Sequence, residues 1–358
     1  MKIIFITTRS ITFNTFLKSQ ADFLTKKGLK VEVACSDIEK LNFKNNLKHK
    51  IDFPNRIIDL FNLVRYLNIF FQIHKLVKKN PSTVFYLHTP VASHLFRLFT
   101  FFKKLKIIYF VHGFRFTTST NFLKAFFFKA IEKIFSYKTD IFITINNEDY
   151  NYVKHNYPKK SLFFKVNGIG LNPTTKNFKK NIFKTKEIKK ILVIAAYKKE
   201  KGYFEILKVA ESLKNHKLRI ECFGYGSSHK FNSIKIKKNI FNISFNKFDS
   251  KLESKIKNFD ILLHLSKREG LPVAVMQSLS KGLPVICYDI RGNNDLIKDK
   301  INGFFINSYK EVSNKILYLK LEKESFNKMR FNAFRSINKN FLNKQINLNI
   351  YKIIKNYL

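Results

Sequence analysis

The sequence predicts an α/β fold made of two doubly wound, Rossmann-like domains. Short apolar runs rich in β-branched residues alternate along the chain with longer helical patterns. This alternation is typical of a parallel sheet with helices on both faces. The pattern restarts after residues 167–180, a polar stretch with Gly168, Gly170 and Pro173 that is typical of a linker. A chain of 358 residues, 45% of them hydrophobic, is long enough to bury a separate core in each domain.

The first domain is expected over residues 1–175. Residues 13–27 form a helical pattern that Gly28 ends. The first apolar run is too short for the core of a signal peptide, and no run is long enough for a membrane span. Strands are predicted at residues 2–7, 31–35, 84–88, 107–112 and 141–145.

The second domain is expected over residues 176–340, and the amphipathic stretch 341–358 is expected to form a C-terminal helix that packs back on the body. In open α/β sheets, ligands bind at the carboxyl ends of the strands, so the cleft between the two domains is the expected site. The predicted elements are helices at 202–213 and 273–281 and strands at 191–195, 218–223, 261–265 and 284–288.

The formal net charge of +42 is the most unusual feature of the composition. Such a charge can serve a polyanionic partner, either nucleic acid or an anionic membrane surface. It can also follow from a lysine-rich composition in which Lys fills solvated positions. The positive charge is spread over both halves of the chain rather than gathered in one arm, which favours composition as its cause. We therefore expect no nucleic-acid partner, while attraction to an anionic membrane surface stays open.

The three cysteines are Cys35, Cys222 and Cys287. Each lies alone in or beside an apolar, strand-like run, and no two have the spacing of metal ligands. This arrangement is typical of buried, reduced thiols in a cytoplasmic protein rather than of disulfides or a metal site.

The segment 265–287 carries the residues that point to chemistry. A loop holding Glu269 follows a predicted strand, and Pro272 is expected at the first helical position because it needs no N–H donor there. Gly282 is expected to end the helix. Free backbone N–H groups at 270–273 would then lie at a helix N-terminus, which attracts anions through its unpaired donors and its dipole.

The same segment carries polar groups on both sides of that helix start. Gly270 lets the backbone approach a ligand closely. Glu269 precedes the helix, and Gln277 lies about two turns along it. A ligand with an anionic centre and hydroxyl groups on both sides fits this arrangement, and a nucleotide-sugar has that shape.

These motifs resemble those of the retaining, two-domain glycosyltransferases of the GT-B fold, family four. Their signature is Glu-x7-Glu, with the first Glu in Glu-Gly-Phe/Leu-Pro, followed by Gly-Leu-Pro-Val. Residues 289–297 resemble the branch that builds capsules, exopolysaccharides and O-antigens, and the resemblance covers most of the chain. The matching stretches here are Glu269-Gly270-Leu271-Pro272, Gln277-Ser278, Gly282-Leu283-Pro284-Val285, His88-Thr89-Pro90, His112-Gly113-Phe114, residues 145–149 and residues 168–170.

The resemblance implies a role for each matched position. Glu269 would contact the donor sugar near the reacting carbon, and His112 would line the cleft facing that sugar. Lys201 would neutralise the leaving diphosphate. The residues whose backbone would hold the diphosphate are Gly270, Leu271, Pro272 and Val273, and weaker candidates for lining the cleft are Arg9, Ser10, His88 and Arg291.

The resemblance also implies that no metal ion or other cofactor is needed, because side chains and the helix end stabilise the charge. The nucleotide-sugar is a co-substrate, expected to be UDP-linked, and the acceptor is expected to be a lipid-linked or surface polysaccharide. The absence of an Asp-x-Asp motif from the sequence agrees with metal independence. The protein would be cytoplasmic, with peripheral attachment to the inner face of the cell membrane left open.

Three positions depart from the family pattern. The second glutamate of the signature, which binds the ribose hydroxyls, is Gln277 here, and a neutral hydrogen bond is worth about half a charged one. The basic residue before the Lys-x-Gly stretch is Ala196, unless Lys198 or Lys199 replaces its charge. The usual glycine pair after the first strand is replaced by residues 7–10.

Several residues also have a purely structural interpretation. Glu269 could complement the helix dipole, Gln277 could be an ordinary residue of a half-exposed helix, and His112 could be a satisfied structural histidine. The Phe- and Lys-rich stretches 96–106 and 122–138 fit two interpretations equally well. One is a core-facing apolar stripe with a lysine face, and the other is a surface that docks on anionic lipid.

Three functions follow for testing. The favoured hypothesis is a retaining glycosyltransferase. The alternative is a catalytically weak or inactive relative that acts as a binding or scaffold subunit, motivated by Gln277 and Ala196. A nucleic-acid-binding protein is motivated by charge alone, and it predicts binding that weakens steeply with salt.

Overall fold

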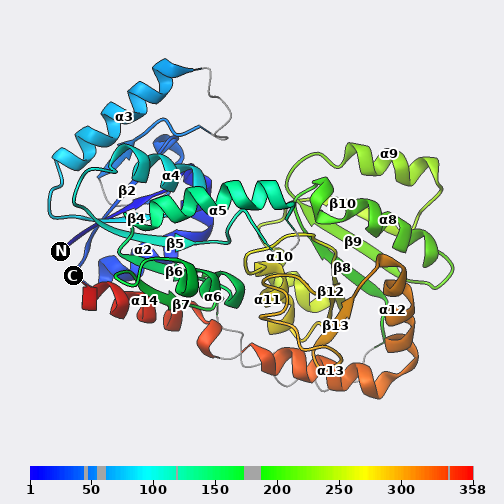
Figure 1. Cartoon of the computed structure of the whole chain (residues 1–358). Helices are drawn as coiled ribbons and strands as arrows, with labels where there is room; N and C mark the ends of the chain where they lie inside the picture. The colour runs from blue at the N-terminus through cyan, green and yellow to red at the C-terminus, as the bar shows by residue number, and fades with distance from the viewer. Residues whose placement is uncertain (44–46, 55–61, 118–119, 173–186, 338, 358) are drawn as a thin grey trace. The chain divides into compact units, whose positions relative to one another are not determined.

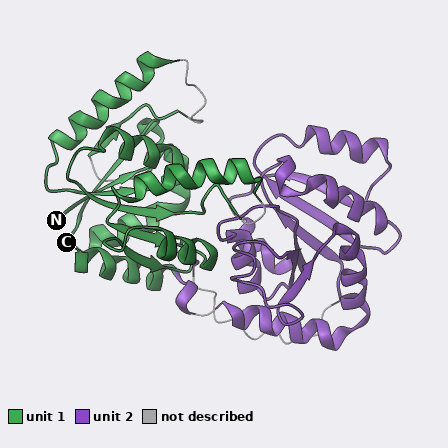
Figure 2. Cartoon of the chain, viewed as in Figure 1, with its two compact units in different colours: residues 1–170, 343–358 green, residues 171–342 purple. Residues whose placement is uncertain are grey.

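The computed structural model describes the chain except residues 44–46, 55–61, 118–119, 173–186, 338 and 358. The chain divides into two compact units (Figure 2). Unit 1 comprises Met1–Gly170 together with Asn343–Leu358, and unit 2 comprises Leu171–Leu342. The boundary expected at residue 175 lies outside the described residues.

Unit 1 contains a seven-stranded parallel sheet in the order β3-β2-β1-β4-β5-β6-β7. Strand β1, Lys2–Ile6, lies inside this sheet between β2 and β4 and is covered on both faces, so the four apolar residues after Lys2 are fully buried. The other strands are β2 Lys30–Cys35, β3 Lys48–Lys50, β4 Val84–Leu87, β5 Lys106–Val111, β6 Ile141–Thr144 and β7 Leu162–Lys165.

The helices of unit 1 cover this sheet (Figure 1). Four of them share one buried apolar cluster with the strands: α3 Leu63–Lys78, α4 Pro90–Phe99, α5 Phe122–Ser136 and α6 Asn147–Asn156. The remaining helical segments are α1 Ser10–Thr12, a π-helical turn Phe13–Leu17, α2 Lys18–Lys26, a 3-10 turn Ile38–Lys40 and α14 Asn343–Tyr357.

The C-terminal helix α14 belongs to unit 1 although the whole of unit 2 precedes it in the chain. It packs against α2, where the Nδ2 of Asn347 lies 3.3 Å from the backbone oxygen of Ser19 and donates to it. The apolar side of α14 is buried through Ile346, Ile350 and Ile354. The last helix therefore completes the layer that α2 begins.

Unit 2 contains a six-stranded parallel sheet in the order β10-β9-β8-β11-β12-β13. The strands are β8 Lys190–Ile194, β9 Arg219–Gly224, β10 Ile243–Lys247, β11 Ile261–His264, β12 Val285–Tyr288 and β13 Gly303–Ile306. The helices are α8 Tyr203–Ser212, α9 His229–Lys237, α10 Leu252–Lys255, α11 Val273–Ser280, α12 Val312–Leu321 and α13 Lys323–Ser336, with 3-10 turns at Lys199–Lys201, Ile256–Asn258, Tyr309–Glu311 and Lys339–Phe341.

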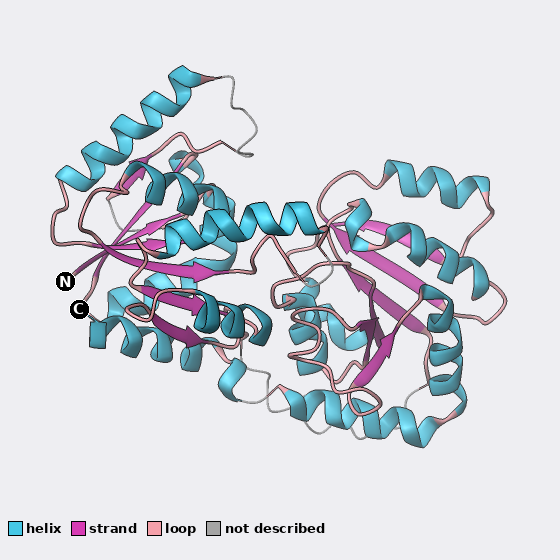
Figure 3. Cartoon of the chain, in the orientation of Figure 1, coloured by secondary structure: helices cyan, strands magenta, loops and turns pink. Residues whose placement is uncertain are grey.

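The fold class predicted from the sequence is confirmed, with two doubly wound parallel sheets (Figure 3). Four strands were missed: β3, β7, β10 and β13. The first three are partly exposed and carry polar residues, and β13 begins with a glycine at position 303, so none of them forms a long apolar run. The helix predicted at 13–27 instead starts at Ser10 and passes through the π-helical turn before it ends at Lys26.

Two further features bear on the sequence-based expectations. Cys35, Cys222 and Cys287 are buried and free of disulfide bonds. In the part of the chain that the structure describes, every helix falls short of the length and apolar character needed to cross a bilayer.

Candidate active site

The loop between β11 and α11 forms the start of the candidate site in unit 2. Pro272 is the N-cap of α11 with an extended backbone (φ −72°, ψ 115°) and not the first helical residue, and the helix begins at Val273, where the predicted range 273–281 begins. At the other end, Gly282 has φ +69° and its N–H donates to the carbonyl of Leu279, which ends the helix as predicted. The N–H groups of the first turn of α11 therefore face the end of the loop that carries Glu269.

Glu269 forms an ion pair at the carboxyl end of β11. Its Oε1 lies 2.7 Å from Nζ of Lys201 and 3.4 Å from Nε2 of His264. The same Lys201 ammonium donates to Oγ of Ser266 at 3.3 Å. Burial raises the pKa of the Glu269 carboxyl, but His264 and Lys201 outweigh this effect and lower the pKa to about 2. Glu269 is therefore an anion at neutral pH.

His264 was not identified from the sequence. It is the last residue of β11 and is buried, so its ring lies beside the Glu269 carboxylate. Its position at the carboxyl end of a predicted strand could have identified it as a site residue, because ligand-binding groups lie at that edge of a parallel sheet.

Gly202 holds Lys201 against this loop. Lys201 ends the 3-10 turn that follows β8, and Gly202 has φ +80°. A Cβ at position 202 would lie 2.3 Å from the backbone oxygen of Leu265, so only glycine allows the two loops to approach. The N–H of Lys267 also donates to the carbonyl of Glu200 at 3.0 Å. Lys201 is thus positioned by backbone contacts on both sides of it.

Arg291 fixes the loop from a third strand. It follows β12, is buried, and its Nε donates to the backbone oxygen of Glu269 at 2.9 Å. The next residue, Gly292, has φ +81°, and a Cβ there would lie 2.3 Å from the backbone oxygen of Gly270. Arg291 was predicted as a residue that lines the cleft. In the structure it contacts and positions the backbone of Glu269 and Gly270.

The remaining candidates of unit 2 follow the loop into α11. Leu271 and Pro272 are buried, while Gly270, Val273 and Gln277 are half-buried. Ala196 lies after β8 and is half-buried, and Lys198 and Lys199 beside it are exposed. The two lysines that could replace the charge missing at position 196 are thus solvent-exposed.

The candidates of unit 1 lie at the carboxyl ends of its central strands. His88 Nδ1 and His112 Nε2 are 3.3 Å apart, so one ring nitrogen donates to the other. His88 is fully buried and stacks on Phe5, whereas His112 is half-buried. The structure therefore places His88 behind His112 rather than at the surface.

Both histidines of this pair are neutral at neutral pH. Burial lowers the pKa of His112 to about 4. Burial and the neighbouring His112 lower the pKa of His88 well below its ordinary value. His112 can thus offer a ring nitrogen for hydrogen bonding without carrying a charge.

Arg9 and Ser10 follow β1 and converge on one carboxylate. Arg9 Nε lies 3.1 Å from Oδ2 of Asp37, and the N–H of Ser10 donates to Oδ1 of Asp37 at 2.7 Å. Beside them, the hydroxyls of Thr8 and Thr89 are 2.8 Å apart. These contacts join the loops after β1, β2 and β4 into one edge of unit 1.

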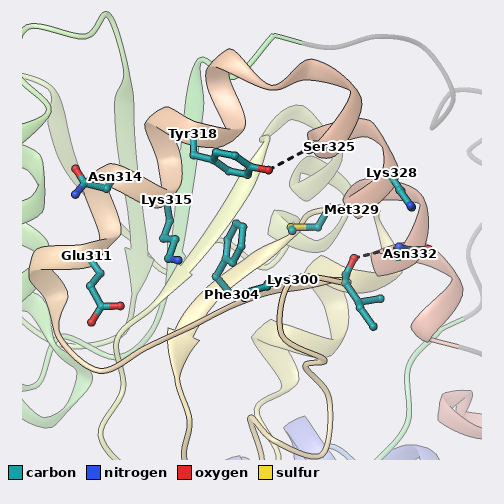
Figure 4. A pocket seen from close by; sticks show the side chains of 11 residues that line it. Lys300, Phe304, Glu311, Asn314, Lys315, Tyr318, Ser325, Lys328, Met329 and Asn332 are labelled. Carbon is teal, nitrogen blue, oxygen red and sulfur yellow. Dashed lines mark hydrogen bonds between the residues drawn. The ribbon is translucent and has the colours of Figure 1, made fainter.

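The predicted residues thus form two groups, one in each unit. A separate hollow of about 720 Å³ lies in unit 2 between β13, α12 and α13 (Figure 4) and holds none of them. Phe304 and Met329 are buried against it, with Lys315 over the Phe304 ring. The hollow adjoins the turn before β13, whereas Glu269 follows the carboxyl end of β11, so we assign the chemistry to the Glu269 group.

Two family models match this chain and together span most of it. Glycosyl transferases group 1 matches residues 174–336, and Glycosyl transferase 4-like matches residues 2–146. The chain therefore belongs to the family-four-like glycosyltransferases of the GT-B fold and is a glycosyltransferase.

Individual relatives agree with this assignment. EpsD of Bacillus subtilis (strain 168), named as a glycosyltransferase, is 27% identical over 321 residues, covering 85% of this chain and 83% of EpsD. An uncharacterised 41.2 kDa protein in the cps region of Klebsiella pneumoniae is 27% identical over 269 residues, which are 72% of this chain and 73% of the Klebsiella protein. These relatives support the exopolysaccharide and capsule branch.

Two more comparisons concern ligands. The UDP-Gal:alpha-D-GlcNAc-diphosphoundecaprenol alpha-1,3-galactosyltransferase of Escherichia coli is 41% identical over 51 residues, which is 14% of this chain and 13% of that enzyme. The structure of HepE from Anabaena in complex with UDP and glucose has a TM-score of 0.77 at 13% identity, and covers 99% of this chain and 100% of HepE. At that identity the likeness shows the shared fold.

Proposed function

We propose that this glycosyltransferase moves a sugar from a UDP-linked donor, with retention of configuration, to a lipid-linked or surface polysaccharide. The observation that carries the proposal is the Lys201–Glu269 ion pair beside the start of α11. It sets a cation next to a helix N-terminus, where both attract a diphosphate, with an anion beside them that can face the sugar.

Charge decides the role of each group. The N–H groups of Gly270, Leu271 and Val273 and the Lys201 ammonium hold the diphosphate and stabilise the charge that grows on it as it leaves. Glu269 is ionised, so it acts as an anion beside the electron-poor reacting carbon and not as a proton donor. The half-buried, neutral His112 faces the sugar as a hydrogen-bonding group.

The acceptor proton needs a base. In this proposal the leaving diphosphate takes the proton of the acceptor hydroxyl while the new glycosidic bond forms on the same face. The reaction needs no metal ion in this proposal, because Lys201 and the start of α11 supply the positive potential.

Donor and acceptor class are supported by the relatives. HepE is described in complex with UDP and glucose, and the E. coli relative is named for a UDP-linked donor and a diphosphoundecaprenol acceptor. A lipid-linked acceptor would bring the protein to the cytoplasmic face of the cell membrane as a peripheral enzyme.

The second candidate is an inactive relative that binds without transferring, motivated by Gln277 and Ala196. An assay with a panel of UDP-sugars separates the two functions. We expect turnover by the wild-type protein, loss of about a hundredfold in kcat/KM in Glu269→Gln and in Lys201→Ala, and unchanged turnover in Lys214→Ala, which removes an exposed lysine of the same unit. Absence of donor hydrolysis and transfer by the wild-type protein, with donor binding retained, would establish the inactive relative instead.

A further inference from the structure

Helix α5 of unit 1 has its polar and apolar sides reversed. It buries Ala125, Glu132, Phe135 and Ser136, so the side facing the core carries a carboxylate. The opposite side is apolar, although it faces outward. Its exposed apolar residues are Phe122, Leu123, Phe126, Phe127 and Ile134, which are between 54% and 79% exposed.

The buried carboxylate is neutralised inside unit 1. Glu132 Oε2 lies 3.0 Å from the Nη2 of Arg97, and Glu132 Oε1 lies 2.8 Å from Nε2 of His94. Arg97 is completely buried and stacks over the ring of Tyr109 at 4.4 Å. Helix α5 is therefore attached to α4 by an internal ion pair, and its only acidic residue does not reach the outer surface.

The outer side of α5 has the pattern of a helix that lies in a membrane interface. At about 100° per residue, the exposed apolar side chains fall within an arc of about 140°. Lys124 borders this arc on one side and Lys129 borders it on the other, while Lys133 falls within the arc near the edge that Lys129 borders; all three lysines are exposed. An apolar arc bordered by lysines on both sides is the pattern of a helix lying in the plane of an interface.

The turn that contacts the residues after α5 carries a further exposed aromatic residue and lysines. Phe102, just after α4, is 97% exposed and is followed by Lys103 and Lys104. The turn is joined to the end of α5, because the Nζ of Lys138 donates to the backbone oxygen of Lys103 at 2.9 Å. Both Phe- and Lys-rich stretches of the sequence therefore present aromatic and basic side chains on neighbouring parts of unit 1.

We propose that α5 docks unit 1 on a bilayer that contains anionic lipids. The phenylalanines would enter the boundary between headgroups and acyl chains, where burying apolar area is favourable, and the lysines would lie near the phosphates. Lipid is favoured over a protein partner because protein interfaces are depleted of lysine, whereas Lys124 and Lys129 border this arc and the exposed Lys133 lies within it. The charge of +42 adds long-range attraction to such a surface.

This inference adds a membrane-docking element to the proposed function. It rests on the proposed function in one respect, which is that docking would give the enzyme access to a lipid-linked acceptor. The docking itself needs neither donor nor catalysis. Vesicle binding measured without donor therefore separates failure of docking from failure of the proposed transfer.

The test is co-sedimentation of the full chain with vesicles of phosphatidylcholine alone and of phosphatidylcholine mixed with phosphatidylglycerol. The key variant carries Phe126→Ser and Phe127→Ser, which keep the net charge unchanged. Its control is Phe241→Ser, which removes a phenylalanine that is 81% exposed in unit 2. Lys124→Gln is compared with Lys214→Gln, and circular dichroism checks that each variant is folded.

We expect the wild-type protein to bind the anionic vesicles in preference to the neutral ones. The double phenylalanine variant should bind roughly tenfold or more weakly and Lys124→Gln roughly fivefold more weakly, while both controls bind like the wild type. Equal binding by the folded phenylalanine variant and the wild type would overturn the proposal. So would a dimer in sedimentation velocity that becomes monomeric in that variant while vesicle binding is unchanged, because the arc would then cover a second copy of the chain.

Discussion

Lys201 and Glu269 are 68 positions apart in the chain, yet the ammonium nitrogen of the first lies 2.7 Å from a carboxylate oxygen of the second. The turn after β8 and the loop after β11 meet because the two strands are neighbours in the sheet and both end at the same edge. The pair sets a cation that can hold phosphate beside an anion that can face a sugar. Bound diphosphate should compete with Glu269 for Lys201.

We expect Lys201→Ala to weaken UDP binding by roughly tenfold to a hundredfold, because a hydrogen bond to a charged group contributes about 1.5–3 kcal/mol. Isothermal titration with UDP measures the loss, with Lys214→Ala as the control. Glu269→Gln removes the competitor and should leave UDP affinity unchanged or increase it. A loss of UDP affinity in Glu269→Gln as large as that in Lys201→Ala would contradict this division of roles.

The pH profile of transfer should be flat near neutrality with respect to Glu269 and His112. Glu269, with a pKa of about 2, stays ionised as pH falls, and His112, with a pKa of about 4, stays neutral until the pH approaches that value. We expect kcat/KM to be constant between about pH 5.5 and 7.5 and to fall only on further acidification, as His112 gains a proton. An acid limb centred near pH 6 that disappears in His112→Asn would show that His112 titrates close to its ordinary value.

Gly202→Ala should destabilise unit 2 more than its backbone conformation alone requires. The added Cβ would meet the carbonyl oxygen of Leu265 at 2.3 Å, and φ is +80°. Gly28→Ala is a matched control, because Gly28 has φ +85° but nothing lies within 4 Å of its Cβ position. We expect about 1–2 kcal/mol for Gly28→Ala and on the order of 3 kcal/mol or more for Gly202→Ala, measured by urea unfolding. Equal losses would mean that the two loops separate freely.

Gln277→Glu should strengthen nucleotide binding if Gln277 faces the ribose. A charged acceptor makes a hydrogen bond about twice as strong as a neutral one, so we expect UDP affinity to rise by a few-fold. The same variant should show no gain with 2′-deoxy-UDP if the 2′-hydroxyl is the partner. An equal gain with both nucleotides would place the effect elsewhere than on that hydroxyl.

Glu132→Ala should cost about 3–5 kcal/mol of the free energy of unfolding, because it leaves the buried Arg97 without its carboxylate. Glu324→Ala, on an exposed residue, is the control and should be within about 0.5 kcal/mol of the wild type. Urea unfolding measures both. An unchanged midpoint in a folded Glu132→Ala protein would show that Arg97 finds another partner.

The same cluster predicts an acid-dependent loss of stability. Burial raises the pKa of Glu132, but Arg97 and His94 outweigh it and lower the pKa from 4.5 to about 2. The folded state therefore holds the proton less tightly than the unfolded state. Its contribution, on the order of 3 kcal/mol, is complete above about pH 4.5 and is lost as pH falls toward 2. The difference in unfolding free energy between wild type and Glu132→Ala should shrink over that window.

The boundaries of the central elements were predictable because their residues decide them locally. Four consecutive buried residues make β1 a continuous apolar run, and Gly282 ends α11 through a backbone angle that other residues adopt with difficulty. The peripheral strands were missed for the opposite reason. β3 has the sequence Lys-His-Lys and forms by pairing with the carboxyl end of β2, so its own residues show no apolar pattern that predicts a strand.

The sequence by itself determined the fold class, the order of the elements and the anion-attracting start of α11, since each depends on neighbours within a few turns. It also singled out Lys201 and Glu269 as separate candidates. Only the tertiary structure paired them, added His264, and showed Arg291 holding the Glu269 backbone. It also turned Phe122, Phe126 and Phe127 of α5 outward, because the core takes Glu132 to pair with Arg97. Which side of a helix is buried depends on contacts with residues far away in the sequence, and the local periodicity of the helix carries no information about those contacts.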